Sequence, residues 1–250
     1  GVLPESGCAP SYWGRSRPRR RPGVPRVRAG RPSNAGSPPS VAAVRRSGCG
    51  VITASRAVSE VTDVSTGVAV VIVDPDPSWS AQFHAEAQVL RELFGSLARR
   101  IDHIGSTSVP GLAAKNVIDI QVTVARPTVL DDADHPVRRS LADAGYDFSA
   151  DNDDGRKRFF SRRRPDEVPV NLHVRRDGCV SQQQALLLRD YLREHPAARQ
   201  RYEREKRRLS RQRWRSVDDY ADAKGDVVWD LLRQADVWSW QGWTPGPSDA

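Results

Sequence analysis

The chain has 250 residues, a formal net charge of +8 and 38% apolar residues. This length allows one good-sized core with a tail, or two small domains, and a mean hydropathy of −0.60 is typical of a soluble protein with a modest core. The sequence contains no run of about 18 apolar residues and no short apolar core of a secretory signal. We therefore predict no membrane span and a cytoplasmic location.

The excess positive charge lies in the first quarter of the chain. Residues 1–66 hold 11 Arg and three acidic residues, whereas the rest holds 28 basic and 28 acidic residues. Because proline removes donors and arginines repel one another, we predict that 1–66 is a disordered Arg/Pro/Gly-rich tail. The tail is either an arm for RNA or another anionic surface, or upstream high-GC coding sequence translated in frame and without function. A neutral core is a poor general nucleic-acid binder.

The ordered part is predicted to begin near residue 68. The β-branched run 68–73 predicts a buried strand, and Asp76-Pro77 predicts the start of a helix that runs to about residue 93 before Gly95. Further strands are predicted at 100–104, 117–124, 146–148, 158–161 and 168–174. Further helices are predicted at 128–144 with an interruption at His135-Pro136, at 182–194, at 197–212 and at 217–238, before a frayed tail at 242–250.

A glycine-hydroxyl loop, Gly105-Ser106-Thr107-Ser108, follows one of these strands and leads into a helical turn. Glycine lets the backbone approach a phosphate closely, and the hydroxyls and helix-start amides are donors for an anion. The loop is not a Walker motif, and a Gly-Ser-Thr string alone is as often an ordinary turn.

Thirteen residues after Ser106, Asp119 lies inside the predicted strand 117–124. Alternation places Asp119 and Gln121 on one face and the apolar residues of the strand on the other. A carboxylate in an apolar strand is costly unless it has a partner. Asp119 either holds Mg²⁺ (or Mn²⁺) together with substrate phosphates, or bonds to the amides and hydroxyls of the loop.

The spacing of Gly-Ser and of Asp119 resembles the signature of the polymerase-β-type nucleotidyltransferase superfamily. The longer string HIGSTSVPGLAAKNVIDI at 103–120 resembles the GrpB family, whose members have a nucleotidyltransferase-like fold. The resemblance implies an α/β (α+β) domain over 67–241, with a mixed sheet flanked by helices and with C-terminal helices. Further matching positions are Pro77, Trp79, 171–174, 188–193, Tyr202, Lys206 and Lys224.

The activity of this family is largely unassigned, and the chain departs from the superfamily pattern. Superfamily enzymes use two or three carboxylates to hold two divalent ions. Here Gln121 replaces the second acid, and the third position falls on Asn171 or His173. One hypothesis is therefore a metal-dependent nucleotidyltransferase acting on an unknown acceptor. The other is a nucleotide- or CoA-related binding module without transfer, since similar domains are fused to dephospho-CoA kinase in some bacteria.

A set of polar residues is expected to form the site. Lys206 and Lys224 lie on the apolar stripes of their helices, where a lysine needs an anion or must extend to solvent. Asp190 is a candidate to restore a missing acid. The predicted catalytic residues are Asp119 and His173; the predicted phosphate-binding residues are Gly105, Ser106, Thr107, Ser108, Lys115, Arg189, Lys206 and Lys224; the predicted supporting residues are His103, Gln121, Asn171, Asp190 and Tyr202.

Overall fold

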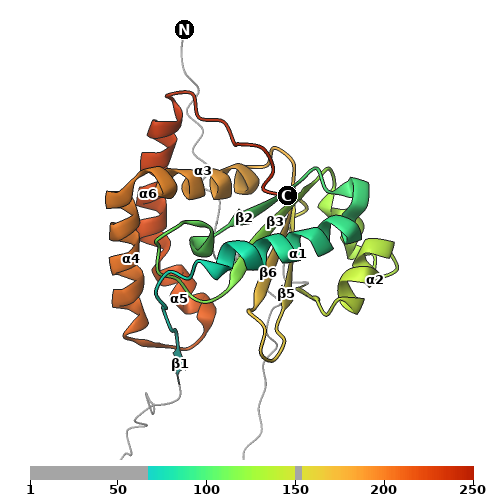
Figure 1. The fold of residues 1–250 in the computed structure, drawn as a ribbon, viewed down its shortest axis with the longest axis horizontal. Helices are drawn as coiled ribbons and strands as arrows, with labels where there is room; N and C mark the ends of the chain where they lie inside the picture. Colours follow the sequence, from blue (N-terminus) through green and yellow to red (C-terminus); the bar gives the residue numbers. More distant parts are fainter. Residues whose placement is uncertain (1–66, 150–153) are drawn as a thin grey trace, which may run out of the picture. The chain divides into compact units, whose positions relative to one another are not determined.

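The computed structural model describes residues 67–149 and 154–250 (Figure 1). The predicted disordered tail at 1–66 lies outside the described residues. No helix within the described part of the chain is long and apolar enough to span a membrane.

A five-stranded mixed sheet forms the centre of the domain, with the order β2-β3-β6-β5-β4. The pairing of β3 with β6 is parallel, and the other three pairings are antiparallel. This mixed sheet with flanking helices confirms the predicted fold class. The strands are β2 (Arg100–Ile104), β3 (Ile118–Val124), β4 (Asp147–Ser149), β5 (Lys157–Arg162) and β6 (Val170–Arg176).

Helix α1 (Ser78–Phe94) packs on one face of this sheet (Figure 1). Its apolar side chains, among them Phe83 and Leu90, are buried in one cluster with Ile120 and Leu172 of the sheet. As predicted, Asp76 accepts a hydrogen bond from the Ser78 N–H at 2.8 Å, and Gly95 ends the helix with a φ of 51°. The predicted helix 128–144 is a short helical turn, η4 (Pro127–Asp131), followed by α2 (Pro136–Asp143).

The C-terminal helices form a second apolar cluster. The predicted single helix 217–238 is two helices that meet at Lys224, where Gly225 lowers the helix propensity. This break matters because it places Tyr220 and Lys224 on the wall of a pocket. The helices are α3 (Val180–Glu194), α4 (Pro196–Ser210), α5 (Val217–Ala223) and α6 (Gly225–Ser239).

Two peripheral segments differ from expectation. The predicted buried strand 68–73 is only partly formed: β1 (Val68–Ala69) pairs with β7 (Arg213–Trp214), and Val73 forms an isolated bridge with Ala114. Val70 is buried, but the Val71 side chain is 69% exposed. A run of β-branched residues favours an extended backbone, but it does not specify which strand will pair with it. The predicted frayed tail at 242–250 instead lies along the outer edge of β2, where Ser248 and Asp249 accept the free N–H groups of the strand.

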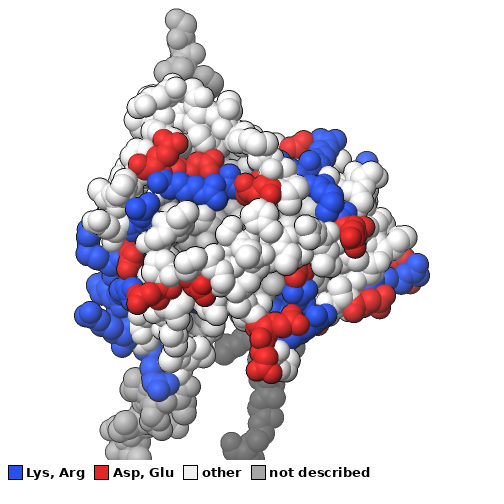
Figure 2. Space-filling view, viewed as in Figure 1, with Lys and Arg blue, Asp and Glu red and all other residues white. Residues whose placement is uncertain are grey.

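Lys and Arg side chains gather over α4 in Figure 2. Most of these arginines face an acid one turn away or on the neighbouring helix: Arg208 lies 2.6 Å from Glu205, and Arg201 lies 2.7 Å from Asp230. Exposed pairs of this kind contribute little stability and leave little net field. The patch is therefore a solvent-exposed face of α4 on which most arginines are paired with acids.

Candidate functional site

The face of the sheet opposite α1 carries polar side chains in place of apolar ones. The parallel register of β3 and β6 sets Asp119 beside Asn171 and Gln121 beside His173. Residues directly opposite one another on paired strands share a face, so these four side chains point away from the apolar cluster under α1. The alternation that buries Ile120 therefore presents Asp119 to the other side.

Helices α3, α4 and α5 and the start of α6 close over this polar face and leave a pocket with about 1010 Å³ of empty space, part of it open to solvent. Apolar side chains line one part of the wall, among them Leu188, Leu192 and Val228. The charged residues that line it are Lys115, Asp119, Arg175, Arg189, Lys206 and Lys224.

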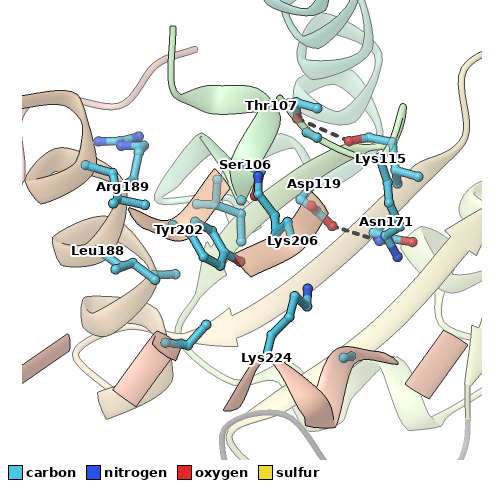
Figure 3. A pocket seen from close by; sticks show the side chains of 18 of the residues that line it. Ser106, Thr107, Lys115, Asp119, Asn171, Leu188, Arg189, Tyr202, Lys206 and Lys224 are labelled. Atoms are coloured by element: carbon cyan, nitrogen blue, oxygen red, sulfur yellow. Dashed lines mark hydrogen bonds between the residues drawn. The ribbon is translucent and has the colours of Figure 1, made fainter. Parts of the chain in front are cut away.

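The loop predicted to handle phosphate lies at this pocket, directly against Asp119 (Figure 3). Gly105 adopts a φ of 73°, and a Cβ added there would lie 2.4 Å from Asp119 Oδ2. Ser108 Oγ donates to the Gly105 carbonyl at 2.6 Å, and Thr107 Oγ1 donates to the Val117 carbonyl at 3.1 Å. Both of these hydroxyls therefore hold the shape of the loop. The pocket is lined by Gly105, Ser106 and Thr107, and Ser108 lies behind it.

Asp119 is held as an anion by its neighbours. Asn171 Nδ2 donates to Asp119 Oδ1 at 2.7 Å, and Arg163 in turn donates to Asn171 Oδ1 at 2.6 Å. Burial acts to raise the pKa of Asp119, but His173, Asn171 and Lys115 together bring that pKa below its usual value. His173 Nε2 lies 3.6 Å from Asp119 Oδ1, and burial lowers the pKa of this imidazole despite the nearby carboxylate.

Three lysines from three separate segments converge on the pocket. Lys206 is 2% exposed and donates to the Ala113 carbonyl, and burial lowers its pKa to about 7. Burial lowers the pKa of Lys224 to about 8, with Asp119 opposing the shift. Burial and the neighbouring Lys224 also lower the pKa of Lys115. The ammonium groups of Lys115 and Lys224 lie 5.8 and 4.8 Å from the centre of the Tyr220 ring.

Tyr202 also lines the pocket. Burial raises its pKa to about 12, against a hydrogen bond with Ser106, so the phenol stays protonated at neutral pH. Tyr202 and Asn171, which were predicted as supporting residues, thus both line the pocket, and Asn171 donates to Asp119.

Other predicted residues lie near the pocket but are engaged elsewhere. The Arg189 guanidinium bonds Asp190 and Asp249, each at 2.7 Å, and Asp190 also accepts from Trp243. Asp190 does not line the pocket, so it does not replace a missing acid there. The Asp249 contact has no signal in the local sequence, since it joins residues that are 60 positions apart.

His103 lies on the opposite face of the sheet from Asp119. The antiparallel register sets it beside Ile120, and its ring stacks on Phe83 with centroids 4.7 Å apart. Burial lowers the pKa of His103 to about 3, so the imidazole is neutral. Its Nε2 lies 3.1 Å from Thr107 Oγ1, which makes it a support of the loop from behind.

Gln121 is buried behind the pocket and accepts a hydrogen bond from Arg175 at 2.5 Å. Arg175 itself lines the pocket and was missed by the sequence analysis, although it follows His173 by two positions and so shares its face. A glutamine bonded to a cation thus stands where the sequence resemblance led us to expect a second carboxylate.

These residues do not fit a site for two divalent ions. Asp119 is the acid that lines the pocket, and three ammonium groups and Arg175 line it as well. Within 67–149 and 154–250, no three Asp, Glu, His or Cys residues are arranged to hold a metal ion. Mg²⁺ binds carboxylates and phosphates and is repelled by cations, so this set of side chains is a poor site for it.

Restoring the acid at position 121 is expected to leave the protein without a magnesium response. In Gln121→Glu the new carboxylate would pair with Arg175, whose guanidinium already bonds this position. The melting temperature of the variant should therefore be the same with Mg²⁺ as with EDTA. A Mg²⁺-dependent rise that Asp119→Ala removes would contradict this interpretation.

The mixed sheet, the loop at Gly105 and the pocket carboxylate of Asp119 are features that the sequence resemblance led us to expect. The chain belongs to the GrpB family: the model described as GrpB protein matches residues 69–234. This confirms the family resemblance. The chain is 33% identical over 191 residues to UPF0157 protein BH1888 of Halalkalibacterium halodurans, covering 73% of this chain and 93% of that protein.

Two further comparisons extend this relation. A dephospho-CoA kinase of Mycolicibacterium paratuberculosis is 35% identical over 199 residues, which cover 70% of this chain and 48% of the kinase. The chain thus spans about half the length of that relative. Among solved structures, GrpB from Enterococcus faecalis is 29% identical with a TM-score of 0.60, over 68% of this chain and 99% of that chain.

Proposed function

We propose that the pocket binds a phosphorylated small molecule, either a nucleotide or a CoA-related compound, through lysine side chains and without a metal ion. The observation that carries this proposal is the distribution of lysine. The chain has only four lysines among 39 basic residues, and three of them, Lys115, Lys206 and Lys224, line this pocket. Lysine is a compact charge whose pKa responds to burial, which makes it suited to bind an anion reversibly.

The energetics of the pocket support an anionic ligand. Burying an ammonium group is costly unless an anion accompanies it, and the lowered pKa values of Lys206 and Lys224 express that cost. Asp119 supplies one negative charge against three ammonium groups. A phosphate would supply the remaining charge, and the loop at Ser106 would lie beside it.

The ligand class follows from the rest of the wall and from the relatives. Leu188, Leu192 and Val228 offer an apolar surface for an organic body next to the lysines. The dephospho-CoA kinases that match this chain support a CoA-related compound or a nucleotide as that body.

Metal-dependent nucleotidyl transfer is the second candidate function, favoured by one observation: Asp119 lies against the loop, as a phosphate-bound ion would require. With a single carboxylate, the ligand's own phosphates would have to supply most of the metal coordination. The two candidates therefore differ in whether binding needs a metal.

Thermal shift and calorimetry with ATP, UTP, CoA and dephospho-CoA, each in EDTA and in Mg²⁺ or Mn²⁺, separate the candidates. We expect a ligand to raise the melting temperature in EDTA. Lys224→Gln should weaken that ligand by about tenfold to a hundredfold, since charge-assisted hydrogen bonds are lost. Lys157→Gln, the one lysine outside the pocket wall, is the matched control and should leave affinity unchanged.

Asp119→Ala decides between the candidates. Without a metal, Asp119→Ala leaves binding of the phosphate group itself, measured with inorganic phosphate in EDTA, intact or tighter, because a like charge near the phosphate is gone. Stabilisation that needs Mg²⁺ and disappears in Asp119→Ala would establish the metal-dependent candidate instead. No shift with any of these ligands would exclude both.

A further inference from the structure

Two residues that line the pocket each carry a buried polar atom that lacks a hydrogen-bond partner among the described residues. These atoms are Nε2 of His173 and the phenolic oxygen of Tyr220. Buried polar atoms in folded proteins are almost always bonded, because an unbonded one loses its hydration without compensation. Their position at one pocket indicates that the partners belong to a ligand.

The surroundings of His173 define what its partner must be. Its Nε2 lies 3.6 Å from Asp119 Oδ1, which is too long for a hydrogen bond. Its ring lies against Phe159, with centroids 5.1 Å apart, and burial keeps the imidazole neutral. Asp119 is anionic and accepts from Asn171 through the same oxygen. A ligand group that contacts both atoms from the side has to donate to the carboxylate and bond the imidazole nitrogen.

An alcohol hydroxyl meets both demands, because it has one hydrogen to donate and two lone pairs to accept. A phosphate oxygen does not, because it carries negative charge and would face the anionic Asp119. The unpaired Tyr220 hydroxyl has different surroundings. The ammonium groups of Lys115 and Lys224 lie 5.8 and 4.8 Å from the centre of the Tyr220 ring, so an anion held by both lysines would lie beside this residue.

We propose that the pocket recognises phosphorylated alcohols: the phosphate bonds Lys115, Lys224 and Tyr220, and a hydroxyl of the same ligand bonds Asp119 and His173. This inference rests on the proposed function and narrows its ligand to compounds such as sugar or polyol phosphates, including the ribose phosphate of a nucleotide. Inorganic phosphate and alkyl phosphates fill only half of the site.

A pair of small probes tests the hydroxyl requirement directly. Glycerol 3-phosphate and propyl phosphate share a three-carbon chain and a phosphate and differ in their hydroxyls. We expect glycerol 3-phosphate to bind the wild-type chain about tenfold more tightly in EDTA, since one buried hydroxyl gains well-placed hydrogen bonds. Calorimetry or ligand-observed NMR measures both affinities.

Two variants assign the preference to its residues. His173→Phe keeps a ring beside Phe159 and removes the nitrogen, so it should make the two probes bind almost equally. Tyr220→Phe removes only a hydroxyl and should weaken both probes by a similar factor while it leaves their ratio intact. Circular dichroism checks that each variant is folded, and if His173→Phe is not, the wild-type ratio and Tyr220→Phe still decide.

The outcomes separate this inference from the function on which it rests. Equal or tighter binding of propyl phosphate by the wild type overturns the hydroxyl subsite and leaves phosphate binding standing. A preference that persists in folded His173→Phe overturns the assignment to His173. Absence of binding by both probes overturns the proposed function itself.

Discussion

Gly105→Ala is expected to destabilise the fold by about 3 kcal/mol and to abolish ligand binding, whereas Gly111→Ala should cost only about 1 kcal/mol. Both glycines have a positive φ, 73° at Gly105 and 74° at Gly111. A Cβ at Gly111 would meet nothing within 4 Å, but at Gly105 it would lie 2.4 Å from Asp119 Oδ2. The two substitutions therefore share the strain of a positive φ and differ in the clash with the carboxylate.

The backbone conformation at Gly105 also opposes a side chain. Gly105 combines its φ with a ψ of −169°, a region that is essentially restricted to glycine. The loop also has little freedom to move away, because Ser108 and Thr107 hydrogen-bond it to its surroundings. The clash is thus relieved by displacing Asp119, which would break its bond to Asn171.

Urea unfolding of the two alanine variants measures these costs, and a double variant isolates the clash. In an Asp119→Ala background the carboxylate is absent, so the penalty of Gly105→Ala should fall by about 1–2 kcal/mol, a coupling expected only between residues in contact. Equal penalties for Gly105→Ala and Gly111→Ala would mean that the loop shifts freely and that the contact with Asp119 is unimportant.

The contact between Gly105 and Asp119 shows which part of the site sequence reasoning reaches. Strand alternation placed Asp119 on one face, and helical spacing turned Lys206 and Lys224 inward; these are local periodicities that the chain carries in itself. The structure brings all three to the pocket that the loop lines.

Features that depend on pairing register or on distant segments were not predictable in the same way. His103 and Asp119 both lie in strands next to the loop, yet the register of β2 against β3 puts them on opposite faces. Arg189 lines the pocket, but its guanidinium forms an ion pair with Asp249, a carboxylate near the C-terminus. Neither the register nor that partner is encoded within a short window of sequence.

Lys206→Met is expected to stabilise the protein by about 2 kcal/mol near pH 7 and to destabilise it by about 1 kcal/mol near pH 10. The folded-state pKa of Lys206 is about 7, below the ordinary value of 10.5. Between these two values the unfolded chain binds more protons than the folded one, so the wild type gains stability as pH rises. Methionine has no charge to desolvate and does not show this gain.

The reversal at high pH has a separate cause. Neutral Lys206 still donates to the Ala113 carbonyl, a buried bond that methionine cannot make. Denaturant unfolding of wild type and variant across this pH range measures the crossover. Arg204→Met, on the exposed side of the same helix, is the control: arginine stays charged throughout, so its effect should be small and independent of pH.

Binding is expected to change in the opposite direction to stability. Lys206→Met should bind the phosphorylated ligand at least about tenfold more weakly at pH 7, because a buried positive charge beside the anion is lost. If removing Lys206 makes the protein more stable and weakens ligand binding, the role of this lysine is to bind the ligand. Its burial would otherwise only lower the stability of the fold. A variant that is less stable than wild type at both pH values, or that binds the ligand unchanged, would show instead that Lys206 is a structural donor to Ala113.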